Sequence, residues 1–238
     1  MKNAFIFAAA LFVVGFFTTT AQATPITIDV HYNGMENGSE NISASLLGRS
    51  NTVMAGMISF SHSNPSAPLP FNFDGDLLAF CIEFSQMLNT SQTMQYTITA
   101  AHQWFSALQA DAITRLYTGF GSQTGTARND AAFQLALWEL VYDFNGTDFT
   151  GLSLASGNFK ANRQSTSVTL ANSWLNQLAN VTSQHTMFVM TNAHSQNQLI
   201  FTGNNGTPFN EPLPVSAPAT FGIFCLGLFG LALRRRLR

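Results

Sequence analysis

Charged residues are scarce in this sequence. Only 9% of its 238 residues are charged, whereas ordinary soluble domains carry roughly a quarter. Together with a hydrophobic content of 46%, this excludes a disordered tail and a nucleic-acid-binding protein. Residues 24–214 hold five of the basic residues and all twelve acidic ones, which gives this part a formal charge of −7. We therefore expect no polyanion, and no nucleic acid, among the partners.

The common motifs for metals and cofactors are also missing. The five histidines are scattered, and no H-x-x-x-H or C-x-x-C spacing occurs. The sequence contains neither a P-loop nor a G-x-G-x-x-G motif. We therefore predict no metal site and no cofactor.

The first 23 residues have the pattern of a secretory signal peptide. Lys2 supplies a positive start, an apolar run covers 4–17, and Ala21-Gln22-Ala23 fits the small-x-small cleavage rule. The run is shorter than the roughly 20 residues of a membrane span, which favours cleavage after Ala23 over a membrane anchor. We therefore predict an exported protein with an exported body over residues 24–210.

Residues 211–238 form a tail of three parts. A proline-rich spacer covers 211–218, an apolar segment covers 219–233, and basic residues follow it, namely Arg234, Arg235, Arg236 and Arg238. About fifteen residues rise only about 22 Å as a helix, short of a hydrocarbon core of roughly 30 Å. The arginines favour a cytoplasmic C-terminus. Two interpretations stay open: a permanent single-span anchor, and a sorting signal that is inserted transiently and then cut.

This tail resembles the PEP-CTERM class of bacterial sorting tails. Where that class usually has Pro-Glu-Pro, this sequence has Val215, Ser216, Ala217 and Pro218. The resemblance implies processing by an exosortase-like membrane transpeptidase. It also implies a precursor held in the inner membrane and a mature protein at the cell surface or outside the cell.

The sequence pattern of the body predicts an α+β fold, with a sheet or sandwich-like β part and an inserted segment of about three helices. Alternating or continuous apolar residues predict strands over 26–32, 53–60, 77–84, 94–98, 187–190 and 198–201. The last two resemble a hairpin. Apolar residues at helical spacing predict three helices, over 100–117, 129–144 and 166–180, the second with Asn129 as its N-cap.

Cysteine is nearly absent. One of the two cysteines, Cys225, lies in the apolar tail, so the exported body holds only Cys81. An odd cysteine in an exported protein implies an intermolecular bridge, a free thiol or another covalent use. Gln134 is a second unusual residue, because it lies beside the apolar stripe of a predicted helix, where an unpaired amide costs a few kcal/mol.

These residues resemble the motifs of the thioester domains of bacterial surface proteins. Those domains carry an aromatic-Cys motif and a later Gln-x-x-apolar-Trp motif, matched here by Phe80-Cys81 and by Gln134-Leu-Ala-Leu-Trp138. Phe133 precedes this glutamine, where the known domains usually have threonine. The resemblance implies a Cys81–Gln134 thioester, sheltered by Phe80 and Trp138, that an amine or hydroxyl on a surface ligand would open.

Other interpretations of the same residues remain. Cys81 is equally well explained as a small buried core residue of a noncovalent matrix component. A surface hydrolase would need a base near Cys81, and His102 is the least implausible histidine. Glu139 and Asp143 lie four residues apart on the predicted helix, which is typical of a solvated face. We predict an attachment module that is not an enzyme.

Overall fold

The computed structural model describes residues 25–71, 75–162 and 164–202, which belong to one compact unit, Pro25–Pro214. The predicted signal peptide and the whole sorting tail lie outside the described residues. The described part combines strands with three α-helices, so the predicted α+β class is confirmed. No helix in these ranges is long and apolar enough to cross a membrane.

Six strands form a closed barrel in which every neighbouring pair is antiparallel. Around the barrel they are β1 (Ile26–Met35), β4 (Ile58–Ser63), β5 (Leu77–Cys81), β9 (Ser195–Thr202), β8 (Thr186–Asn192) and β6 (Met94–Ala100), which returns to β1. Alternation in β1 buries Ile28 and Val30, as the period of a strand requires. Closure leaves this sheet without a free edge.

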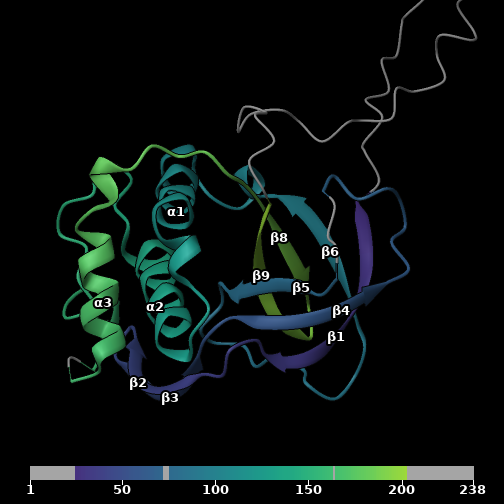
Figure 1. Cartoon of the computed structure of the whole chain (residues 1–238), viewed down its shortest axis with the longest axis horizontal. Helices are drawn as coiled ribbons and strands as arrows, with labels where there is room; N and C mark the ends of the chain where they lie inside the picture. Colours follow the sequence, from purple (N-terminus) through teal and green to yellow (C-terminus); the bar gives the residue numbers. More distant parts are fainter. Residues whose placement is uncertain (1–24, 72–74, 163, 203–238) are drawn as a thin grey trace, which may run out of the picture. The chain divides into compact units, whose positions relative to one another are not determined.

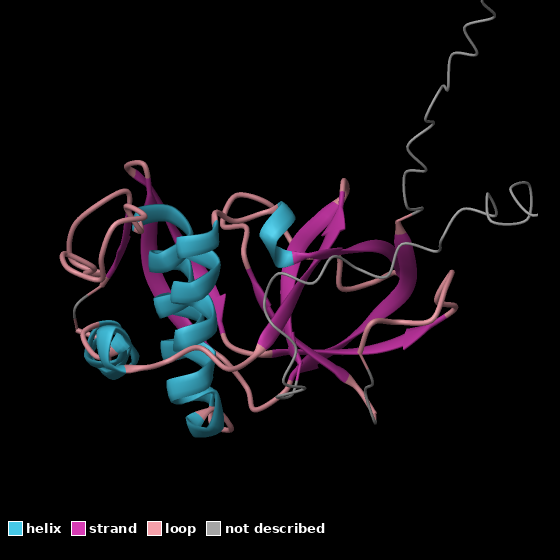
Figure 2. Cartoon of the chain, turned by 90° about the horizontal axis from the view of Figure 1, so that it is seen from above, coloured by secondary structure: helices cyan, strands magenta, loops and turns pink. Residues whose placement is uncertain are grey.

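A smaller sheet of three strands accompanies the barrel. Its order is β3 (Arg49–Ala55), β2 (Glu40–Leu46) and β7 (Phe159–Ala161), again antiparallel. The helices are α1 (Ala107–Phe120), α2 (Ala127–Asp143) and α3 (Thr166–Leu175), with short 3-10 turns η1 (Ala101–Gln103), η2 (Gly121–Gln123) and η3 (Leu178–Asn180). Figure 1 shows the three helices together on one side of the barrel, with β2 and β3 below α2 and α3. Seen from above, the helices gather at one end and most strands at the other (Figure 2).

Helix α2 is the central helix of this layer. It packs against α1 and α3 and also against β2, β3 and β7. Eleven consecutive residues, from Asp130 to Leu140, are buried, including the polar Gln134 and Glu139. A helix buried on all sides places polar side chains in the core, where they need partners.

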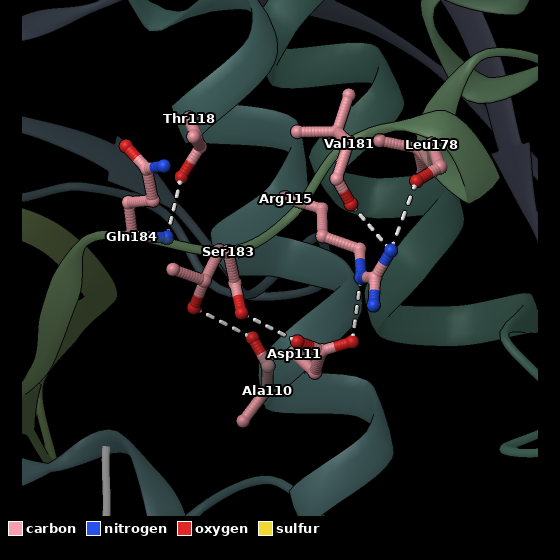
Figure 3. Close-up of polar contacts among 9 residues, drawn as sticks. Ala110, Asp111, Arg115, Thr118, Leu178, Val181, Ser183 and Gln184 are labelled. Atoms are coloured by element: carbon pink, nitrogen blue, oxygen red, sulfur yellow. Dashed lines mark hydrogen bonds and ion pairs between the residues drawn. The ribbon is translucent and has the colours of Figure 1, made fainter. Parts of the chain in front are cut away.

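The connection from the helices to the last two strands is held by polar contacts on α1 (Figure 3). Arg115 pairs with Asp111 at 2.6 Å and donates to the main-chain oxygens of Leu178 and Val181. Asp111 also accepts from the Ser183 hydroxyl at 2.6 Å. These contacts fix the chain between η3 and β8 along the surface of α1.

Several predicted boundaries are wrong. The expected strand 53–60 is two strands, β3 and β4, separated at Gly56, where a Cβ atom would lie 2.9 Å from the Gly38 main-chain oxygen. The expected helix 100–117 is a 3-10 turn followed by α1, which begins after the N-cap Ser106. The N-cap of α2 is Thr126, whose hydroxyl accepts from Asn129 N at 3.2 Å.

Two other elements end differently from the prediction, and two were missed. The expected strand 77–84 stops at Cys81, and the expected helix 166–180 stops at Leu175 before η3. Strands β2 and β7 were not predicted at all. The predicted hairpin of the last two strands is confirmed by the pairing of β8 with β9.

Candidate functional site

Cys81 and Gln134 are adjacent in the fold although 53 positions separate them. Cys81 ends β5 and Gln134 lies in the buried middle of α2, with exposed fractions of 8% and 1%. The Cys81 N–H donates to Gln134 Oε1 at 2.9 Å, and Gln134 Nε2 donates to the Cys81 main-chain oxygen at 2.7 Å. The amide that the sequence places in the core is therefore paired in both directions with the cysteine backbone.

The Cys81 thiol has a hydrogen-bond partner that sequence reasoning missed. Sγ donates to Gln196 Oε1 at 2.8 Å, and the Gln196 amide donates in turn to the main-chain oxygen of Glu83. Burial raises the pKa of Cys81 to about 12, so the thiol is protonated at neutral pH. Nothing in the sequence around Gln196 distinguishes it from the neighbouring asparagines and glutamines, because only the β5–β9 pairing brings it to Cys81.

A tyrosine holds the chain that follows Cys81. The Tyr142 hydroxyl accepts from Phe84 N at 2.8 Å and donates to the Ile82 main-chain oxygen at 3.2 Å. Tyr142 lies on α2, two turns beyond Gln134. The same helix therefore contacts Cys81 through Gln134, and Ile82 and Phe84 through Tyr142.

Two aromatic clusters flank the pair. Phe80 packs on Phe133 with ring centroids 4.4 Å apart. Trp138 packs edge-on against Phe84 at 5.4 Å and lies 5.7 Å from Phe159. Phe80 and Trp138 are each 2% exposed, so both predicted sheltering residues lie in the core near the Cys81–Gln134 pair.

The prediction of a solvated face is wrong for Glu139, whereas Asp143 is partly exposed. Glu139 is 1% exposed, accepts from Ser153 N at 2.7 Å, and leaves Oε2 without a partner in the described part of the chain. Burial raises its pKa to about 7. Asp143 accepts at 2.7 Å from the backbone N–H groups of both Asn158 and Phe159. Both carboxyl groups hold the returning chain, including the start of β7, onto α2.

One cleft reaches the thiol. It has a volume of about 340 Å³, and its lining includes Cys81, Trp138 and Gln196 together with residues of β1, β3 and the segment after β5. No histidine belongs to the described lining of this cleft, and His102 is exposed in η1. Within the described ranges no group of three His, Cys, Asp or Glu side chains is arranged to hold a metal ion.

Comparisons with known proteins identify no family. No protein-family description matches the sequence, and no curated protein matches it. Among solved structures, the chain is similar to the thioester domain of the Staphylococcus aureus TIE protein, with 12% identity and a TM-score of 0.46. The match covers 73% of this chain and 92% of that one. At this level of similarity the match establishes neither a family nor an activity for this protein.

Proposed function

We propose that this protein is an exported bacterial attachment module whose Cys81 and Gln134 side chains form an internal thioester. In the reaction, Cys81 Sγ would bond to Gln134 Cδ and the Cδ–Nε2 bond would break. The thiol proton would leave with the amide nitrogen as ammonia, so the atoms balance. A ligand amine or hydroxyl would later open the thioester in a single turnover.

The observation that carries this proposal is the paired contact between the Gln134 amide and the Cys81 backbone. The Cys81 N–H donates at 2.9 Å to the oxygen that would carry negative charge during attack at Cδ. A donor already aimed at that oxygen stabilises the tetrahedral intermediate. The high pKa of the thiol means that the sulfur is protonated at rest, with its proton donated to Gln196 Oε1. Because the thiolate is the attacking form, this proton would have to move to the leaving nitrogen during the reaction.

The test is the intact mass of the exported body purified without reductant or amine buffers. The unmodified body should have a mass one ammonia below its sequence mass. The Cys81→Ala and Gln134→Ala variants should each have the full mass of their own sequence. Gln109→Ala is a matched control, because Gln109 lies on α1 and its amide donates only to the main-chain oxygens of Leu140 and Val141. Full mass with one free thiol in the unmodified protein would contradict the thioester.

Export and tail processing complete the proposal. Residues 1–23 would direct export, and the tail would hold the precursor in the inner membrane until an exosortase-like transpeptidase cuts it. Replacing Arg234, Arg235, Arg236 and Arg238 by serine should impair membrane retention of the precursor, as measured by fractionation of the expressing cells. An unchanged distribution of precursor and mature protein would contradict this part.

A second candidate function is a noncovalent structural component of an extracellular matrix, with Cys81 as an inert core residue. It is favoured by the two hydrogen bonds that already satisfy the Gln134 amide without a covalent bond. In that case Cys81→Ala costs only a small cavity, about 1 kcal/mol, and no amine forms an adduct.

A further inference from the structure

Trp104 differs from the other two tryptophans of the chain because it is exposed. Trp138 and Trp174 are each 2% exposed and lie in the core, whereas Trp104, directly after η1, is 46% exposed. It lines a cleft of about 300 Å³ that shares no described lining residue with the cleft at Cys81. An indole that is half in water and lines a cleft presents a flat apolar surface to a ligand.

Three polar side chains line the same cleft and keep hydrogen-bonding capacity within the described part of the chain. The Glu83 carboxylate accepts from Asn197 N at 3.4 Å through Oε2, which leaves Oε1 as an acceptor. Gln109 donates from Nε2 to two main-chain oxygens of α2, which leaves its Oε1. Asn197 Oδ1 accepts from Asn192 N at 3.0 Å, which leaves its Nδ2 as a donor. The cleft therefore offers two acceptors and one donor beside an aromatic face.

Asn197 also lines a neighbouring cleft of about 430 Å³. This cleft lies on the outer face of the barrel, because Gln95 and Thr97 line it, whereas Tyr96 between them is buried and successive residues of a strand point to opposite faces. Strand β8 contributes a further hydroxyl from Thr191. The two clefts adjoin at Asn197 and together form a polar surface that extends from β6 and β8 to the indole.

The two linings carry little charge. Glu83 is their one acidic member and His194 their one histidine, and neither described lining includes a lysine or an arginine. An anionic ligand would find no cationic partner there and would approach a carboxylate. The remaining polar members carry hydroxyl or amide groups. Such a surface suits a ligand that has many hydroxyl groups and no negative charge.

We infer that these two clefts bind an oligosaccharide without negative charge, with one sugar ring on the Trp104 indole and the sugar chain continuing across Asn197. The C–H groups on one face of a pyranose ring are apolar and pack on an aromatic plane, and the hydroxyl groups around the ring both donate and accept. Glu83 and Gln109 accept from these hydroxyl groups, and Asn197 donates to them. This binding is noncovalent and does not depend on the proposed thioester.

The experiment is calorimetric titration of the exported body with three uncharged hexasaccharides, cellohexaose, maltohexaose and hexa-N-acetylchitohexaose. Anionic hexaguluronate and a decaproline peptide are titrated alongside. At least one uncharged hexasaccharide should bind, and more tightly than the disaccharide of the same sugar, because the disaccharide cannot extend over both clefts. Hexaguluronate should not bind, because the linings hold no lysine or arginine.

Trp104→Ala should weaken this binding at least about tenfold, because it removes the aromatic face, whereas Trp104→Phe should keep most of it. Gln103→Ala is a matched control, because Gln103 is exposed on η1 but belongs to neither lining. It should bind like the unmodified protein. Circular dichroism of each variant checks that the fold is retained.

The outcomes separate this inference from the thioester. Failure of all three uncharged hexasaccharides to bind overturns the inference, and Trp104-dependent binding of decaproline alone would assign the cleft to a proline-rich polypeptide instead. Binding that Trp104→Ala does not weaken, or equal binding of hexaguluronate, also overturns it. The intact mass of the same preparation reports the thioester separately, so full mass together with saccharide binding contradicts the thioester and leaves this inference standing.

Discussion

Glu139 is a buried carboxyl group on α2 whose ionisation makes the stability of the protein depend on pH. Burial raises its pKa to about 7, whereas an unfolded chain has an ordinary glutamate pKa near 4.5. Between these values the folded state holds a proton that the unfolded state has lost. The contribution of Glu139 to stability is therefore complete below about pH 4.5 and is lost as the pH rises through 7.

Glu139→Gln should remove this pH dependence, because glutamine keeps an oxygen for Ser153 N but does not ionise. Between pH 5 and pH 8 the unmodified protein should lose roughly 2–3 kcal/mol of unfolding free energy that the variant retains. Urea unfolding at both pH values measures the difference. Parallel losses in the two proteins would show that Glu139 is not responsible.

At the scale of elements, the start of α2 depends on one hydroxyl. Thr126 caps the helix that carries Gln134, Trp138 and Tyr142. Thr126→Ala should lower the free energy of unfolding by about 1 kcal/mol, and Thr126→Ser should restore most of it. Denaturant midpoints of the three proteins check this. If alanine and serine are equally destabilising, the loss comes from packing of the threonine methyl group and not from the cap.

The break between β3 and β4 depends on a residue without a side chain. A Cβ atom on Gly56 would lie 2.8 Å from Met35 Cε and 2.9 Å from the Gly38 main-chain oxygen. The methionine can move, but the backbone oxygen cannot move cheaply. Gly56→Ala should therefore cost about 1–3 kcal/mol, measured by thermal or urea unfolding. A variant as stable as the original would show that the loop around Gly38 adjusts freely.

At the scale of the whole molecule, the barrel and the helices share one hydrophobic core. Buried residues of the barrel, such as Ile28 and Phe201, belong to the same continuous cluster as Leu137 of α2 and Trp174 of α3. The cleft that reaches Cys81 is lined by residues of the barrel, of β3 and of α2, so the site exists only when all three are assembled.

A chain of residues 25–202 should therefore unfold as one cooperative unit. Far-ultraviolet circular dichroism follows the helices and strands, and fluorescence follows tryptophans such as Trp138 and Trp174 in the helix layer. The two signals should give coincident transitions in urea. Two separated transitions would show that the barrel and the helix layer are independent folding units.

The sequence alone determined the features that depend on local pattern. Apolar spacing predicted the existence of α2 and the burial of its stripe, and the β8–β9 hairpin followed from two short apolar runs near each other. Cys81 and Gln134 were recognised because a lone cysteine and a core-facing amide are unusual residue types whatever the fold. Caps and breaks were predicted less well, since Thr126 and Gly56 act through a single hydroxyl and a single close approach.

Only the tertiary structure decided the features that depend on pairing between distant segments. Barrel closure joins β1 to β6 and β5 to β9, and no periodicity within a strand specifies its neighbour. The same pairing brings Gln196 to Cys81, and the surrounding helices and strands turn Glu139 from an expected surface residue into a buried one. The spacing of apolar residues decides which face of a helix or strand is buried, whereas long-range packing decides which other element that face contacts. The surroundings of Cys81 depend on this long-range packing.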